Sequence, residues 1–375
     1  MSIHAWPFAN AHISQVEQPI QLGFLCPHNV RDKRSFSGTA YHAVRALEKR
    51  KDLALRLIGL HERPSRFGRW RKPRPAYDLR QKDLTGLDAA VGLVATPLLA
   101  QLAQLAPGLP FLHVTDATPK FLREAYGWAV PVRMDALEAD VASQALVSVY
   151  SSESIAGRAA KDLAIADLTA TCLPFGVNLE SVPTAPCPKP SLETVELLFV
   201  GKDWERKGGD IAVEIVSTLR ALNRPARLTI VGPCPENLSG RPGIQAVGSL
   251  DKTRPRHAKQ LENLYARAHF LLVPSRADCT PMVIAEAMAH GTPVIAADTG
   301  GIRNQVHSPK TGRVMPLYSP PESWAEIIIG LSEDREDYLR LSEAAFEHCH
   351  NHFSWDAWAL GIAALLQTAL AKPIP

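Results

Sequence analysis

The sequence predicts an α/β protein with two doubly wound, Rossmann-like domains that face a central cleft. Short apolar runs of strand length alternate with segments that have helical spacing of apolar residues, a pattern typical of parallel sheets covered by helices. The same alternation begins again after a proline-rich stretch at residues 183–190. A chain of 375 residues is long enough for two such domains.

Composition narrows the class of protein. The 41 basic and 38 acidic residues leave a formal net charge of +3, which is too small to indicate a nucleic-acid partner. The six cysteines have no paired spacing, so they predict neither a zinc ribbon nor a disulfide framework and fit a reducing cytosol. The first residues lack a signal-peptide pattern, and no apolar run is long enough to span a bilayer. We therefore expect a cytoplasmic protein whose contact with a membrane is at most peripheral.

The first half of the chain contains five predicted strands, at residues 20–26, 53–59, 89–95, 110–115 and 145–150. Gly38 begins the first predicted helix after a loop with three basic residues, so a donor phosphate or an anionic acceptor can approach the backbone there. A solvated loop explains the same residues equally well. His113 and Asp116 lie at the end of the fourth strand, either as cleft groups or as a core hydrogen-bonder and a cap.

A basic stretch follows the second strand. Its basic and aromatic residues are Arg63, Arg66, Phe67, Arg69, Trp70, Arg71, Lys72 and Arg74. Cations interleaved with aromatic rings are one way to hold a protein on anionic lipid. Prolines at positions 64, 73 and 75 argue against an amphipathic helix and favour an ordinary exposed loop.

The second half repeats the alternation. It predicts strands at 195–201, 226–232 and 270–274 and helices at 209–222, 261–269 and 355–370. Between the first of these strands and its helix, a glycine-flanked loop carries Lys202 and Lys207, two flexible ammonium groups suited to a diphosphate. The alternative is that Asp203 and Glu205 pair with these lysines on the surface.

Residues 277–297 predict a strand-to-helix turn with an anion site. Thr280 suits the N-cap, Pro281 the first helical position and Gly291 the C-cap, so we expect a helix from Pro281 to His290. The backbone donors of Thr280, Met282 and Val283 then lie at the positive end of the helix dipole. Phosphate is the expected ligand of this site.

Two acids flank this anion site. Asp278 precedes the helix and Glu286 lies roughly 8 Å farther along its axis. Carboxylates repel phosphate but accept hydrogen bonds from hydroxyl groups, so one acid suits a sugar and the other a ribose. This arrangement favours a sugar nucleotide, with a helix cap plus a solvated glutamate as the alternative. The run from His348 to His352 resembles a metal cluster, but no complementary set of acids or cysteines accompanies it locally and it lies just before the last predicted helix, which favours a solvated or partly packed turn.

These motifs resemble those of the retaining glycosyltransferases of the GT-B fold, specifically family 4. The matching segments of the second half are residues 200–208, 278–286, 291–295 and 300–301. Ser37-Gly38, residues 151–153 and residues 174–178 match more weakly in the first half. The resemblance covers nearly the whole chain.

The resemblance implies a role for each matching residue. Lys202 and Lys207 grip the diphosphate, Asp278 meets hydroxyls of the donor sugar, and Glu286 holds the ribose. The backbone between the two acids touches sugar and phosphate. The implied domains are an acceptor domain over residues 1–185, a nucleotide-sugar donor domain over 191–353 and a C-terminal helix over 354–375 that can cross back to the first domain.

The implied reaction transfers a sugar from a nucleoside-diphosphate sugar, the co-substrate, to a hydroxyl of a glycan or lipid-linked acceptor, with retained anomeric configuration. It needs no metal and no cofactor, and it belongs to glycan, glycolipid or polysaccharide synthesis. Three positions depart from the family. Asp278 replaces the common glutamate, Thr115 and Asp116 replace a frequent His-Asp pair, so that Asp116 faces the reacting centre, and Asn304 replaces an acid.

Two other functions fit the same architecture. A sugar-nucleotide 2-epimerase would convert the donor without an acceptor. A non-catalytic nucleotide-sugar-binding protein would bind the donor and turn nothing over. The residues do not choose among UDP, GDP and ADP.

Overall fold

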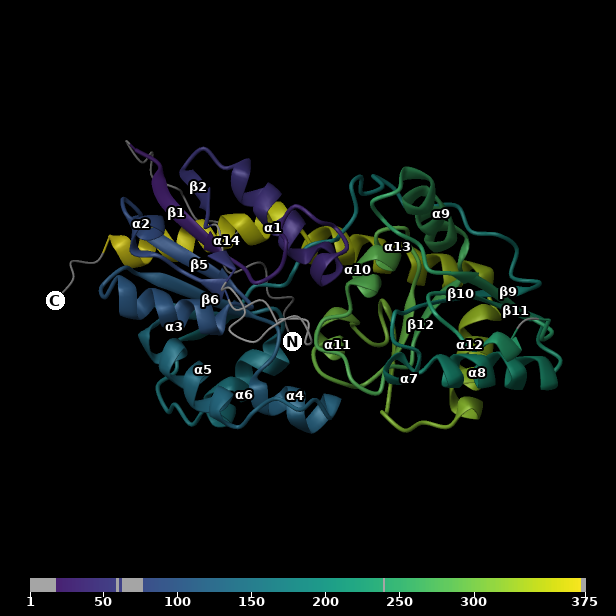
Figure 1. The fold of residues 1–375 in the computed structure, drawn as a ribbon. Coiled ribbons are helices and arrows are strands. Elements are labelled where there is room, and N and C mark those ends of the chain that lie inside the picture. Colours follow the sequence, from purple (N-terminus) through teal and green to yellow (C-terminus); the bar gives the residue numbers. More distant parts are fainter. Residues whose placement is uncertain (1–17, 59–60, 63–76, 239, 372–375) are drawn as a thin grey trace. The chain divides into compact units, whose positions relative to one another are not determined.

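The computed structural model describes residues 18–58, 61–62, 77–238 and 240–371. Contacts between Cα atoms divide the chain into two compact units. Unit 1 comprises residues 1–123, 128–175 and 355–375, and unit 2 comprises residues 124–127 and 176–354. Figure 1 shows the elements of both units in the colours of the sequence.

Unit 1 is built on a parallel six-stranded sheet with the order β2-β1-β5-β6-β7-β8. Its strands are β1 (Ile20–Leu25), β2 (Leu53–Leu57), β5 (Ala89–Leu93), β6 (Phe111–Thr115), β7 (Val147–Tyr150) and β8 (Ala170–Cys172). A separate antiparallel pair consists of β3 (His61–Glu62) and β4 (Tyr77–Asp78). Strands β5 and β6 are buried along their whole length, as expected for central strands of a covered parallel sheet.

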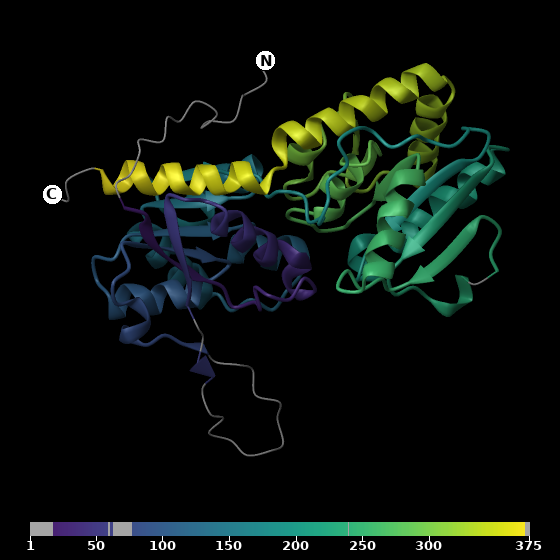
Figure 2. The same ribbon diagram turned by 90° about the horizontal axis from the view of Figure 1, so that it is seen from above.

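The helices of unit 1 include the last one of the described chain. They are η1 (Ser35–Gly38), α1 (Thr39–Glu48), α2 (Gln81–Leu84), α3 (Thr96–Leu105), α4 (Pro119–Tyr126), α5 (Arg133–Gln144), α6 (Glu153–Leu163) and α14 (Trp355–Leu370). Helix α14 packs beside α1, and Figure 2 shows it lying along this unit. Trp358 and Ile362 are fully buried, and a Cβ at Gly361 would lie 2.8 Å from Leu173, so α14 contributes to the core of unit 1.

Unit 2 is built on a second parallel six-stranded sheet, with the order β11-β10-β9-β12-β13-β14. Its strands are β9 (Val195–Val200), β10 (Ala226–Val231), β11 (Ile244–Gly248), β12 (Phe270–Val273), β13 (Val294–Ala297) and β14 (Gly312–Met315). Its helices are α7 (Trp204–Lys207), α8 (Gly209–Ala221), η2 (Glu236–Leu238), α9 (Pro255–Arg267), α10 (Met282–Met288), α11 (Ile302–Gln305), α12 (Pro321–Ser332) and α13 (Arg335–His352). The predicted fold class of two Rossmann-like α/β domains is therefore confirmed.

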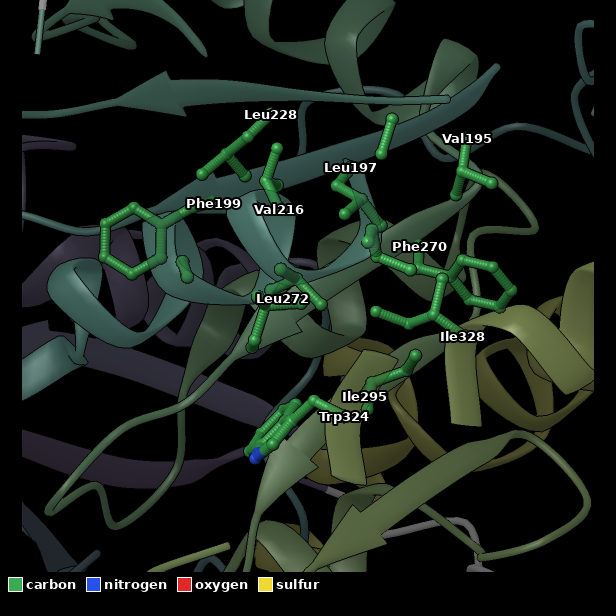
Figure 3. Packing of buried hydrophobic residues seen from close by; sticks show 14 of the residues in the cluster. Val195, Leu197, Phe199, Val216, Leu228, Phe270, Leu272, Ile295, Trp324 and Ile328 are labelled. Carbon is green, nitrogen blue, oxygen red and sulfur yellow. The ribbon is translucent and has the colours of Figure 1, made fainter. Parts of the chain in front are cut away.

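One face of this second sheet forms the core shown in Figure 3. Alternate residues of β9, such as Leu197 and Phe199, point to the same side as Phe270 and Leu272 of β12. Helices α8 and α12 cover that side, and Trp324 of α12 is one of the largest fully buried side chains. This packing fixes the sheet on whose carboxyl end the candidate site lies.

Helix α10 is shorter than predicted at both ends. Its cap residue is Pro281 rather than Thr280, because Pro281 has an extended ψ of 106° and its carbonyl accepts from Ile284 N at 3.1 Å. The helix ends at Met288 instead of His290, since its last turn tightens and Gly291 N donates to Met288 O at 2.9 Å. The prediction of a helix from Pro281 to His290 capped by Thr280 was wrong in these details.

The turn predicted at residues 348–352 is also wrong, because these residues form the last turn of α13. Asp334 caps this helix and accepts from Asp337 N at 2.8 Å. The buried side chains of Tyr338, Leu341, Ala345 and Cys349 follow helical spacing into the histidine run, so packing continues the helix there. No group of His, Cys, Asp or Glu among the residues that the structure describes is arranged to hold a metal ion.

The basic stretch from Arg63 to Arg74 lies outside the described residues. The prediction of peripheral membrane contact that rests on it therefore stays a prediction. Within the described ranges, no helix combines the length and the apolar character needed to cross a membrane.

Candidate functional site

The candidate site of unit 2 begins at an ion pair between Lys207 and Asp278. Strands β9 and β12 are parallel neighbours, so the loops that follow them meet at the same edge of the sheet. Lys207 comes from the first loop and Asp278 from the second, and Lys207 Nζ donates to Asp278 Oδ2. The Asp278 side chain is only 8% exposed, and Ser275 Oγ lies 3.4 Å from the same oxygen. A buried acid and a cation 71 residues apart in sequence therefore meet at this edge.

The loop that carries Lys207 is shaped by its flanking residues. Asp203 caps the short helix α7 and accepts from Arg206 N at 3.2 Å. Gly208 ends that helix with a φ of +73°, and a Cβ there would lie 2.1 Å from Pro274 O. Arg206 Nη1 donates to Ala277 O at 2.9 Å. These contacts hold the lysine loop against the end of β12.

Lys202 lies in the same loop but differs from Lys207. Its side chain is exposed, and it has no ion pair within the described part of the chain. Asp203 pairs with Arg206, at 3.0 Å between Arg206 Nε and Asp203 Oδ2. Arg276 donates to the backbone carbonyl of Glu205. The alternative that Asp203 and Glu205 pair with the two lysines is therefore wrong.

A second ion pair holds the other candidate acid, Glu286. This side chain is 1% exposed and points from the middle of α10. Lys252 Nζ donates to its Oε1, and Tyr265 OH donates to its Oε2 at 2.9 Å. Both acids at this edge are thus buried and each has a lysine partner.

The backbone between the two acids runs into the first turn of α10. Met282 is buried, and Thr280 and Val283 are half-buried. The backbone of Gly300, which has a φ of +55°, packs closely against this segment: a Cβ at Gly300 would lie 1.9 Å from Asp278 O. Only a glycine allows this close approach of the two backbones.

The candidate residues of unit 1 lie near the ends of β1 and β6. Gly38 is buried, has a φ of +89° and begins α1 after Phe36 and Ser37, whose φ values are +47° and +56°. Such a run of positive φ stores backbone strain, which is common in ligand-binding loops. Asp116 follows β6 and is half-buried.

His113 is a core hydrogen-bonder. Its side chain is fully buried, Nδ1 lies 3.3 Å from Ser148 Oγ, and Nε2 lies 3.5 Å from Thr96 Oγ1. Burial lowers the pKa of His113 to about 4, so the imidazole is neutral at neutral pH. Of the two groups predicted at this strand end, Asp116 therefore stays the candidate for a cleft.

Comparisons with known proteins show similarity at the level of sequence and of fold. Residues 194–334 match the family model of the glycosyl transferases group 1. D-inositol 3-phosphate glycosyltransferase of Corynebacterium glutamicum is 33% identical over 190 residues, which are 48% of this chain and 45% of that protein. Residues 194–334, which lie within unit 2, therefore resemble the group 1 glycosyl transferases. The chain matches less than half of the length of this curated relative.

Solved structures extend the likeness to both units. Sucrose-phosphate synthase of Thermosynechococcus elongatus has a TM-score of 0.68 at 17% identity, covering 93% of this chain and 98% of that one. Anabaena HepE in complex with UDP and glucose has a TM-score of 0.64 at 14% identity, covering 93% and 100%. At these identities the likeness shows the fold, which is GT-B.

The structure adds partners of the two acids that the sequence did not predict. Lys252 and Tyr265 contact Glu286, and Lys207 contacts Asp278. Local spacing gives no signal for these contacts, because the partners come from separate elements. The position of Tyr265 on the buried face of α9 is the one feature that could have drawn attention to it.

Proposed function

We propose that this chain is a retaining glycosyltransferase that moves a sugar from a nucleoside-diphosphate sugar to an acceptor hydroxyl. The observation that carries this proposal is the pair of buried acids at one sheet edge, each held by a lysine, on either side of the first turn of α10. The family of residues 194–334 supports it, and so does the fold shared with a protein solved with UDP and glucose.

In this proposal each residue has one task. Glu286 accepts hydrogen bonds from the ribose, and Asp278 accepts them from hydroxyls of the donor sugar. Lys202 and Lys207, with the backbone amides of Met282 and Val283, bind the diphosphate. Lys207 then exchanges the carboxylate of Asp278 for a phosphate, which leaves Asp278 available to the sugar.

The proposed reaction is a front-side displacement. The bond between the anomeric carbon and the phosphate oxygen breaks, and a bond from that carbon to the acceptor oxygen forms on the same face. The acceptor proton passes to the departing phosphate oxygen, whose charge the lysines stabilise. Because ammonium groups and amides neutralise this charge, the proposal needs no metal. Gly38 and Asp116 are the candidates that unit 1 contributes, the latter facing the reacting centre.

We propose a glycan or lipid-linked molecule as the acceptor. The curated relatives are named for D-inositol 3-phosphate, but they match under half of their own length, so this acceptor is one member of the panel to test. The protein would be titrated calorimetrically with UDP, GDP, ADP and their sugars. Binding of none of them would contradict the proposal, and formation of an epimer from the donor alone would replace it with epimerisation.

The sharpest variant is Lys207→Ala. We expect turnover to fall about 10²–10³-fold, because charge on the leaving phosphate loses a preorganised partner, while the dissociation constant of the donor rises much less. Lys161→Ala, an exposed lysine of unit 1, is the matched control and should leave both quantities unchanged. Retention of full turnover in Lys207→Ala would count against the assignment.

A further inference from the structure

The carboxylate of Glu286 has two side-chain partners, which differ in how deeply they are buried. Tyr265 is fully buried on α9, and its ring stacks on His290 at 5.7 Å between centroids. Thr292 Oγ1 donates to Tyr265 O at 2.6 Å, so the main chain of this residue is fixed as well. Lys252 lies in the loop between β11 and α9, and its side chain is 26% exposed. The tyrosine is therefore the fixed partner and the lysine the adjustable one.

These contacts leave part of the carboxylate unused. An ionised carboxylate has about four lone-pair positions. Within the described residues, Lys252 takes one position on Oε1 and Tyr265 one on Oε2, so each oxygen keeps one position for a further donor. The two hydroxyls of a ribose cis-diol would need two such positions.

The two partners also make this buried anion tolerable. A carboxylate that is 1% exposed is costly unless it is paired and hydrogen-bonded. Burial, and then the neighbouring Glu286, raise the pKa of Tyr265 well above its ordinary value, so its hydroxyl stays a donor at all physiological pH values.

We propose that Lys252 and Tyr265 are positioning residues that hold Glu286 as a reader of the ribose cis-diol, so that the site selects ribonucleotides over dideoxynucleotides. This inference rests on the proposed function, in which Glu286 meets the ribose. It adds the residues through which the chain sets the strength of that selection.

The test is a thermodynamic cycle that combines two changes: replacement of Lys252 in the protein and removal of the two ribose hydroxyls from the ligand. Wild type and Lys252→Met are titrated with the tightest-binding of UDP, GDP and ADP and with its 2′,3′-dideoxy analogue. We expect Lys252→Met to bind the ribonucleotide about tenfold more weakly and the dideoxy analogue as tightly as wild type does. Lys252→Arg should restore most of the loss. Tyr265→Phe should show a smaller loss, again for the ribonucleotide alone.

Two controls separate this role from general effects. Lys259→Met removes an exposed cation of α9 that pairs with Glu262, and it should change neither affinity. Lys207→Met should weaken both ligands equally, because it acts on the diphosphate that they share. Unfolding curves of each variant identify any loss that comes from misfolding.

The outcomes distinguish the inference from the function on which it rests. If wild type binds none of the nucleotides, the proposed function fails. If wild type binds ribonucleotide and dideoxy analogue equally, or if Lys252→Met weakens both by the same factor, the inference is overturned and the function stands.

Discussion

Two glutamates, one in each unit, are buried to a similar degree, but only one of them has a cation as a hydrogen-bond partner among the described residues. Glu286 of unit 2 is 1% exposed and is bonded to a lysine and a tyrosine. Glu138 of unit 1 is 4% exposed, and within the described residues it accepts a hydrogen bond from Thr96, with 3.3 Å between Thr96 Oγ1 and Glu138 Oε2. The other oxygen of Glu138 is buried without a hydrogen-bond partner.

The difference has an electrostatic consequence. Burial is the main cause that raises the pKa of Glu138 to about 8; the bond from Thr96 opposes it, and the nearby charges of Asp135 and Asp116 reinforce it. Unit 1 thus keeps a neutral acid beside a neutral His113 at neutral pH. Burial alone does not make a site for charged ligands. The acids of unit 2 differ from Glu138 in that each is paired with a lysine.

The largest expected effect comes from replacing each glutamate by its neutral isostere. Folded Glu138 keeps its proton up to about pH 8, whereas the ordinary value is 4.5, so wild type loses stability as the pH rises through this window. Glu138→Gln has no such proton. Its free energy of unfolding relative to wild type should therefore increase by on the order of 4 kcal/mol between about pH 5 and pH 8.

Urea denaturation at both pH values measures this change. Glu286→Gln should be destabilised by roughly 1–3 kcal/mol, because Lys252 loses its buried partner. Parallel stability curves for wild type and Glu138→Gln would show that Glu138 is ionised in the folded protein, and the contrast between the units would disappear.

Two glycines with the same backbone conformation test how closely the backbones pack in each unit. Gly208 and Gly86 have φ values of +73° and +74°, but a Cβ would meet Pro274 O at 2.1 Å in the first case and nothing within 4 Å in the second. In both alanine variants the left-handed conformation should lower the free energy of unfolding by about 1 kcal/mol. Gly208→Ala should lose about 2 kcal/mol more in chemical denaturation, owing to the clash. Equal losses would mean that the lysine loop can move away from β12.

The smallest effect separates the two lysines of that loop. Lys202 is exposed and unpaired among the described residues, so Lys202→Ala should change the free energy of unfolding by less than about 0.5 kcal/mol. Lys207→Ala leaves Asp278 buried without its cation and should cost about 1–2 kcal/mol. Thermal unfolding of the ligand-free protein is sufficient to compare them. A larger loss for Lys202→Ala would reverse the assignment of the structural partner.

The sequence predicted those features that depend on local pattern. The apolar runs at Val195–Val200 and Phe270–Val273 are strands, and the helix predicted at residues 355–370 has the same bounds in the structure. Thr280 was misjudged as a cap because N-cap preference is a weak guide beside a proline, whose own carbonyl takes the cap position here. The histidine run was misjudged because its helix is held by packing of distant residues on α10.

The sequence indicated which residues belong to the candidate site, but it did not indicate which of them contact one another. Asp278 and Glu286 could be selected from their spacing within one loop and helix, and Lys207 from its own glycine-flanked loop. The ion pairs depend on which strands are neighbours and on where the loop before α9 turns, and 34 residues separate Lys252 from Glu286. The residues of the candidate site were therefore visible in the sequence, and their ion-pair partners were not.

Helix α14 also affects the order in which the protein can mature on the ribosome. The interior of unit 1 needs Trp358 and Ile362, which are translated after all of unit 2. Unit 2 can condense as soon as its last residues emerge, while unit 1 waits, with the surface of α1 that α14 covers still open to chaperones or to proteases. A premature stop codon just before Trp355 would consequently destabilise unit 1, although most of that unit is translated before unit 2.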